Sequence, residues 1–142
     1  MKLNPDCIRD VLLYLEENLK IKDGKIFIPI TLKTLQEELT NYSSEDVFYS
    51  VYNLHQIRFI EGKINDVHNM KMMFCDIENI TYAGHQFLSN IRPQPIWEKT
   101  KSIVSKIGNH TLGFIEGVAH DIAVESAKQA VTIMMTQNPT QQ

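Results

Sequence analysis

The stretch from Thr31 to Gly62 limits the fold more than any other part of the chain. Its first half has apolar residues at helical spacing, which predict a short helix with one apolar face: Leu32, Leu35 and Leu39. A polar run over residues 40–43 favours a turn and a helix cap. A second helix then begins near Ser44, with an inward stripe formed by Val47, Val51 and Leu54. Two short helices joined by a polar turn predict a helix-turn-helix.

The flanking segments complete a mainly α, α+β domain over residues 1–92. Asn4 and Pro5 begin a first helix that should end near Lys20, and residues 26–28 read as a short strand. Thr31 or Thr34 is expected to cap the next helix. After the helix-turn-helix, strands over 59–67 and 71–80 form a hairpin with its turn at 68–70, and a further helix follows Thr81, where Gly84 permits close packing. Helix, strand, helix, helix and hairpin is the winged-helix order.

A second segment, residues 93–137, is predicted to be helical and to join copies of the chain. Pro93 and Pro95 break the chain before it, and Trp97 is expected to hold it onto the first domain. The break at 108–110 leaves one kinked helix or two helices open. Beyond it, an oligomerisation seam runs at alternating spacings of four and three: Gly113, Gly117, His120, Val124, Ala127, Val131 and Met134. Residues 138–142 are expected to be a disordered tail.

Charge and motifs exclude several classes of protein. Lys and Arg total 14 against 17 Asp and Glu, a net charge of −3, which argues against a general nucleic-acid binder but not against a local basic patch. Nucleotide-binding, nucleophile and zinc-ligand motifs are absent, so we expect no enzyme, cofactor or metal. Cys7 and Cys75 are interpreted as free thiols, although a disulfide stays open. Without a signal peptide or membrane span, the protein is expected to be cytoplasmic.

The stretch ITYAGHQFLSNIRPQPIWEKTK, from Ile80 to Lys101, resembles a signature of small uncharacterised phage and bacterial proteins. That family is akin to the YjcQ-like winged-helix proteins, and the resemblance covers about residues 1–102. The residues that carry it are Thr81, Gly84, His85, Phe87, Leu88, Trp97 and Lys99. The resemblance implies a winged-helix fold and a phage or prophage setting, and it implies no activity.

The leading functional hypothesis is a DNA-binding regulator that acts as an oligomer. Outward residues of the second helix of the helix-turn-helix would contact bases: Tyr49, Asn53 and Gln56. Nearby cations would contact phosphate: Lys33, Arg58, Lys63 and Lys71. Acidic Glu45 and Asp46 at the start of that helix weigh against this, because they would meet phosphate there. The alternative is a protein-interaction module, such as a phage factor that binds a host protein; a purely structural homo-oligomer is a third possibility.

Overall fold

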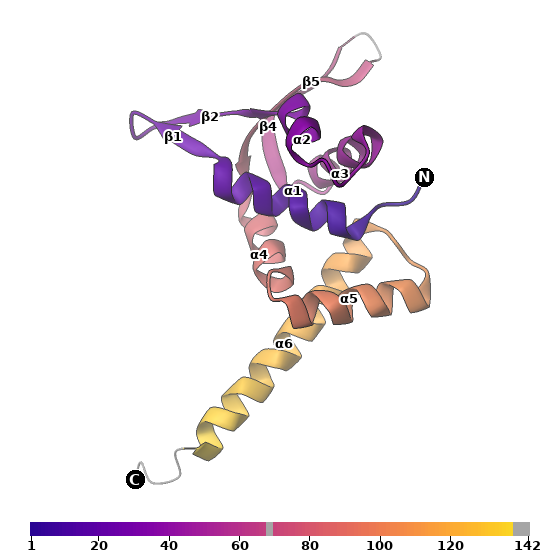
Figure 1. Cartoon of the computed structure of the whole chain (residues 1–142). Helices are drawn as coiled ribbons and strands as arrows, with labels where there is room; N and C mark the ends of the chain where they lie inside the picture. Colours follow the sequence, from indigo (N-terminus) through magenta and orange to yellow (C-terminus); the bar gives the residue numbers. More distant parts are fainter. Residues whose placement is uncertain (68–69, 138–142) are drawn as a thin grey trace.

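The computed structural model describes residues 1–67 and 70–137, and the side chains of these residues outside 65–74. The fold is mixed, mostly helical with small antiparallel sheets (Figure 1). Its helices are α1 (Pro5–Asn18), α2 (Leu32–Glu38), α3 (Ser44–Gln56), α4 (Tyr82–Ile91), α5 (Gln94–Ile107) and α6 (Leu112–Gln137). Its strands are β1 (Lys20–Lys22), β2 (Ile26–Ile28), β3 (Ile30–Thr31), β4 (Ile60–Val67) and β5 (Met70–Ile80).

The predicted helix starts are confirmed by their caps. Asn4 caps α1, Ser43 caps α3 and Thr81 caps α4, each by accepting a hydrogen bond from a backbone amide three residues on. Of the two threonines considered for α2, the cap is Thr31, because its hydroxyl accepts from the amide of Thr34. Two helices joined by a short turn therefore lie where the sequence predicts them, with α2 and α3 separated by residues 39–43.

The first part of the chain differs from the prediction. α1 ends at Asn18, and residues 20–22 form β1, which pairs antiparallel with β2. Asp23 and Gly24 make the turn between them with positive φ angles of 54° and 70°, a conformation that suits glycine and short polar residues. The prediction placed the end of the first helix near Lys20 and did not include the strand over residues 20–22.

A second, three-stranded sheet has the order β3-β5-β4, with both pairings antiparallel. The predicted turn at residues 68–70 falls largely outside the described residues. α4 packs closely against the start of β4: a Cβ on Gly84 would lie 2.1 Å from the carbonyl oxygen of Phe59. The expectation that Gly84 permits this close approach is confirmed.

Residues from both predicted segments share one hydrophobic core. Val47, Val51 and Leu54 of α3 are fully buried, and so are Ile115 and Ala119 of α6. The break at Pro93 is thus a corner between helices that pack into the same core. At the second break, Gly108 ends α5 in the left-handed conformation with φ at 78°, so the helical segment consists of two helices and not one kinked helix.

The N-terminal turn of α1 holds the corner between α4 and α5. The buried Trp97 donates its indole N–H to the Asp6 carboxylate at 2.9 Å, and Lys101 lies 3.1 Å from the same carboxylate. Arg9 donates to the carbonyl oxygens of Ile91 and Arg92 at the end of α4, at 3.0 and 2.7 Å. These contacts confirm that Trp97 holds the segment after the prolines onto the first part of the fold.

α6 leaves this core and projects beyond it (Figure 1). Its first turns are buried at Leu112, Ile115 and Ala119, whereas residues 127–137 are all exposed. Among the described residues, no helix is long and apolar enough to cross a membrane.

Candidate nucleic-acid interface

The turn between α2 and α3 is fixed by side-chain hydrogen bonds on both sides. Tyr42 donates its hydroxyl to the Asp10 carboxylate of α1 at 2.5 Å. Gln36 of α2 donates its amide to the carbonyl oxygen of Ser44 at 3.0 Å. Burial and the neighbouring Asp10 carboxylate raise the pKa of Tyr42 well above its ordinary value, so the phenol keeps the proton that it donates. α3 is therefore held at a defined position against α1.

The outward face of α3 is less open than its sequence predicts. Gln56 is exposed, but Tyr49 and Asn53 are half-buried. The Asn53 side-chain amide donates to the Tyr49 carbonyl oxygen of its own helix at 2.8 Å. Both residues line a hollow that they share with the N-terminal segment and with the connection between α5 and α6, the other lining residues being Met1, Lys2, Leu3, Gly108, His110, Thr111 and Leu112. Gln56 is thus the most accessible of the three predicted base contacts.

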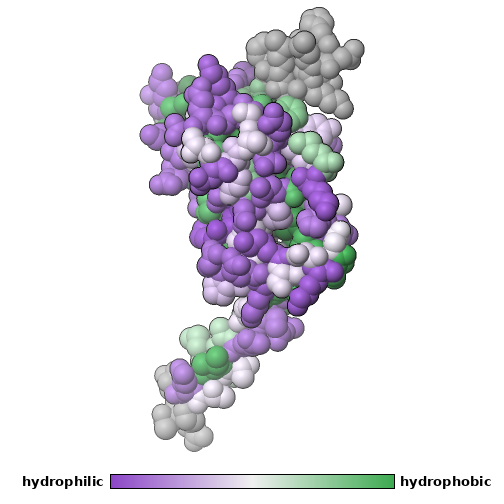
Figure 2. Space-filling model, turned by 45° about the vertical axis from the view of Figure 1, so that its right-hand side comes forward, coloured by the Kyte–Doolittle hydropathy of each residue, from purple (hydrophilic) through white to green (hydrophobic). Residues whose placement is uncertain are grey.

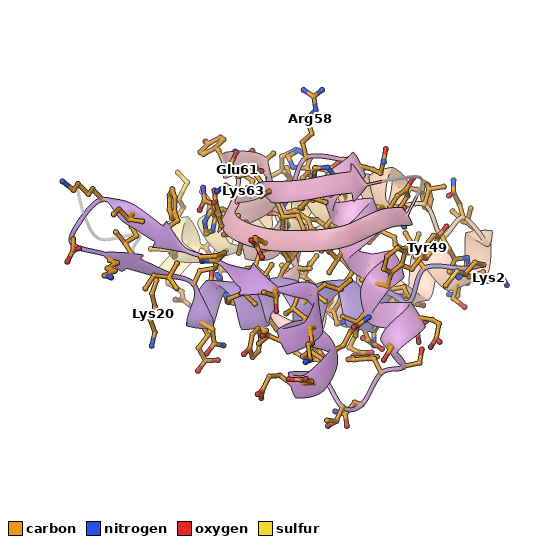
Figure 3. All side chains as sticks on the ribbon, turned by 90° about the horizontal axis from the view of Figure 1, so that it is seen from above. Lys2, Lys20, Tyr49, Arg58, Glu61 and Lys63 are labelled. Atoms are coloured by element: carbon orange, nitrogen blue, oxygen red, sulfur yellow. The ribbon has the colours of Figure 1, made fainter. Side chains whose placement is uncertain are left out.

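The predicted phosphate contacts do not gather around α3. Arg58 is exposed in the left-handed conformation, with φ at 62°, directly after α3, and it projects outward from the molecule (Figure 3). Lys63 is exposed on β4, beside the acidic Glu61 (Figure 3). Lys33 lies 3.9 Å from Glu37 on the same helix, and the side chain of Lys71 falls outside the described residues. Arg58 and Lys63 therefore lie on the segment that follows α3, and neither forms an ion pair among the described side chains.

The N-terminal end of α3 carries the opposite charge. Glu45 and Asp46 lie in its first turn, where the positive end of the helix dipole stabilises them. A phosphate at this end would meet both carboxylates, whereas Gln56 at the other end of the helix and Arg58 just after it carry no negative charge.

Sequence reasoning missed a second group of basic residues. The β1–β2 hairpin is exposed over its whole length and presents Lys20, Lys22 and Lys25, with Ile21 and Phe27 between them. Figure 3 shows Lys20 on this arm, at the end of the molecule away from Tyr49 and Lys2. The Asp-Gly pair between the short segments 20–22 and 26–28 was the signal that could have identified it.

Neither cysteine has the character of a nucleophile. Cys7 is fully buried and Cys75 is 5% exposed, and burial raises the pKa of each thiol to about 11. Within the described residues, no three His, Cys, Asp or Glu side chains are grouped to hold a metal ion.

The predicted oligomerisation residues form one ridge along α6. We use the name α6 ridge for Gly113, Gly117, His120, Val124, Ala127, Val131 and Met134. All are exposed except Gly117, which is half-buried. Figure 2 shows hydrophobic surface on the projecting end of the helix, where Val131 is 56% and Met134 67% exposed.

Comparison with known proteins finds one matching family and a bacterial relative. The family described as hypothetical protein (DUF2513) matches residues 2–110. An uncharacterised protein of Haemophilus influenzae is 29% identical over 123 residues, which cover 86% of this chain and 95% of that protein. No solved structure matches the chain at a significant level. The predicted resemblance to an uncharacterised family is confirmed, whereas the matching description names neither YjcQ nor a winged helix.

Proposed function

The chain belongs to the DUF2513 family of hypothetical proteins, whose description names no activity. From the geometry we propose that the protein is a winged helix-turn-helix DNA-binding regulator of phage or prophage type. One observation carries the proposal. α2 and α3 stand next to a sheet of order β3-β5-β4, whose β4–β5 hairpin directly follows α3 in the chain. A hairpin in that position can lie along a duplex while α3 enters the major groove.

The contact surface is the C-terminal half of α3 together with β4. Gln56 is the base-reading residue, since its exposed amide can pair with adenine. Arg58 and Lys63 contact phosphate, and Lys33 and Lys71 are further phosphate contacts predicted from the sequence. Tyr49 and Asn53 are secondary, because both are half-buried and the Asn53 amide is already engaged within its helix.

The small number of cations sets the expected strength and salt dependence. Each phosphate that a cation neutralises contributes a slope of about −0.9 in a plot of log K against log salt. The two main contacts, Arg58 and Lys63, therefore predict a slope of about −2. Contacts from Lys33 and Lys71 as well would bring the slope to roughly −3 to −4. Binding should accordingly be weak at physiological salt unless the base contacts are made.

Fluorescence anisotropy with a labelled duplex pool, measured over a salt series, tests the proposal. Changing Arg58 and Lys63 together to alanine should weaken binding and reduce the salt slope by about 2. The matched control changes Lys99 and Lys106, two exposed lysines of α5, and should leave the slope unchanged. No binding at low salt, or equal effects of the two double variants, would contradict the proposal.

A second candidate is a non-enzymatic protein-interaction module that uses the same face, for example one that binds a host protein. The acidic first turn of α3 and the half-buried, aromatic character of Tyr49 favour it. Here Glu45 and Asp46 would be attractive contacts for a basic partner. Changing both to the neutral amides should improve DNA binding under the first proposal and abolish capture of a basic partner under the second.

A further inference from the structure

The projecting half of α6 has an apolar surface that the rest of the described chain leaves exposed. Val124 is 38% exposed, Val131 56% and Met134 67%, all on a helix that extends beyond the core (Figures 1 and 2). An apolar helix face of this kind is stable in water when another surface covers it. From the contacts and charges of α6 we infer that this surface is an interface in which two copies of the chain pair their α6 helices in antiparallel orientation.

The α6 ridge lies on a different side of the helix from the residues that anchor it. Ile115 and Ala119 are fully buried against the rest of the chain. At about 100° per residue, the ridge is centred roughly 120° around the helix from them. A Cβ added at Gly113 or Gly117 would meet no atom within 4 Å, so neither glycine is required by packing within the chain. The ridge therefore has open space at both glycines, and between them and the projecting end His120 lines a hollow together with α4 residues such as His85 and Ser89.

Charge selects the orientation of the second helix. In heptad terms Asp121 and Lys128 lie on one edge of the ridge, one repeat apart, and Glu116 lies on the other edge. A parallel pair in register would set Glu116 of each copy against Asp121 of the other, which is repulsive. An antiparallel pair sets Asp121 of each copy against Lys128 of the other, and the two-fold axis makes this attraction twice.

The same register produces matched layers between the helices. With the two-fold axis between residues 125 and 126, Gly117 faces Met134, His120 faces Val131 and Val124 faces Ala127 of the second copy. In each of these pairs a small or intermediate side chain meets a larger one, and the bare surface at Gly117 leaves room for Met134. Ala119 of one copy lies level with residue 132 of the other, so the buried parts of the two α6 helices are offset along the pair.

A second copy fits this surface better than an unrelated partner because the pattern is complementary to itself. Each copy supplies both the acid and the base, and both the small and the large member of each layer. This is the requirement for an isologous interface, in which the same patch serves both partners. The inference does not depend on DNA binding, and it holds equally if α3 binds a protein.

Sedimentation equilibrium of the full chain tests the interface. The expected result is a dimer whose dissociation constant rises at least ten-fold on Val131→Glu. The matched control is Ile133→Glu, which changes a residue that is 53% exposed two positions away but off the ridge, and it should leave the constant within two-fold. A monomer at concentrations up to about 100 μM, or equal loss in both variants, overturns the interface. Circular dichroism checks that both variants stay folded, as expected for positions outside the core.

Charge reversal tests the orientation separately. Asp121→Lys should weaken the dimer, because the introduced lysine would face Lys128 of the second copy, and Lys128→Asp should weaken it in the same way. Combining the two changes should restore association to near that of the parent chain. A parallel dimer would respond oppositely to the first change, since the introduced lysine would then face Glu116, so tighter association of Asp121→Lys overturns the antiparallel arrangement.

Discussion

Substitution of Gly84 by alanine should destabilise the protein, although helix propensity alone predicts the reverse. In an ordinary helix, glycine is about 1 kcal/mol less favourable than alanine. Here the added Cβ would lie 2.1 Å from the carbonyl oxygen of Phe59 and 2.8 Å from Cγ2 of Ile80. A side chain such as Ile80 can rotate away, but a backbone carbonyl cannot, so α4 itself must shift.

The size of the effect follows from what that shift disturbs. Overpacking costs about 1–3 kcal/mol when neighbours cannot move freely. The start of α4 is tied to the same backbone by two bonds, the Thr81 amide to the Phe59 carbonyl at 3.0 Å and the Thr81 hydroxyl to the Arg58 carbonyl at 2.7 Å. Weakening them adds about 1 kcal/mol. After subtracting the gain in propensity, Gly84→Ala should lower the free energy of unfolding by about 2 kcal/mol.

Urea unfolding monitored by circular dichroism measures this change. With a slope of about 2 kcal/mol per M, the midpoint should fall by roughly 1 M. Gly113→Ala is the control, because it is also a glycine in a helix but a Cβ there meets nothing within 4 Å. The control should leave stability unchanged or raise it by up to about 1 kcal/mol. If Gly84→Ala were as stable as the parent chain, the close contact between α4 and Phe59 would be wrong.

Three further predictions concern other parts of the fold. Burial raises the pKa of Asp6, but the hydrogen bonds from Trp97 and Lys101 outweigh it and leave that pKa below its ordinary value. The ionised carboxylate therefore stabilises the fold above about pH 4, and this contribution is lost as the pH falls further. In acid unfolding followed by fluorescence, Asp6→Asn should lose less stability than the parent chain between about pH 5 and pH 2. Cys7 and Cys75 should not react with a thiol reagent near pH 8 until urea unfolds the chain, because both are buried; rapid reaction of the folded protein would contradict their placement. Ser43→Ala should cost about 1 kcal/mol, measured by thermal unfolding, since it removes the bond to the Asp46 amide at the start of α3.

Local patterns predicted the elements of the middle of the chain well. The polar turn before Ser44 and the stripe of Val47, Val51 and Leu54 are local features of a half-buried helix, and the structure confirms them. The strand at Lys20–Lys22 was missed because its sequence carries no comparable burial pattern. It is exposed on both faces, so burial imposes no alternation on its sequence, and its pairing with β2 is visible only through the Asp-Gly turn.

The surroundings of α3 could not be predicted from the same patterns. Tyr49 and Asn53 lie on the outward side of the helix by periodicity, but Lys2 of the N-terminal segment and His110 of the connection between α5 and α6 fold beside them. Helical spacing indicates which side of a helix faces the main core. It contains no information about segments that pack on the other side and lie more than 40 residues from the helix in the sequence. The chemistry of a surface of this kind depends on tertiary contacts.

Helix α1 holds three different parts of the chain through neighbouring side chains. Asp6 binds α5, Arg9 binds the end of α4, and Asp10 binds the turn that precedes α3. These three residues lie within about one and a half helical turns, a length over which a helix bends very little. The orientation of α3 relative to the corner between α4 and α5, against which α6 packs, is consequently set by one rigid helix and not by a linker. A molecule bound at α3 is therefore held in a fixed orientation relative to a molecule bound at α6.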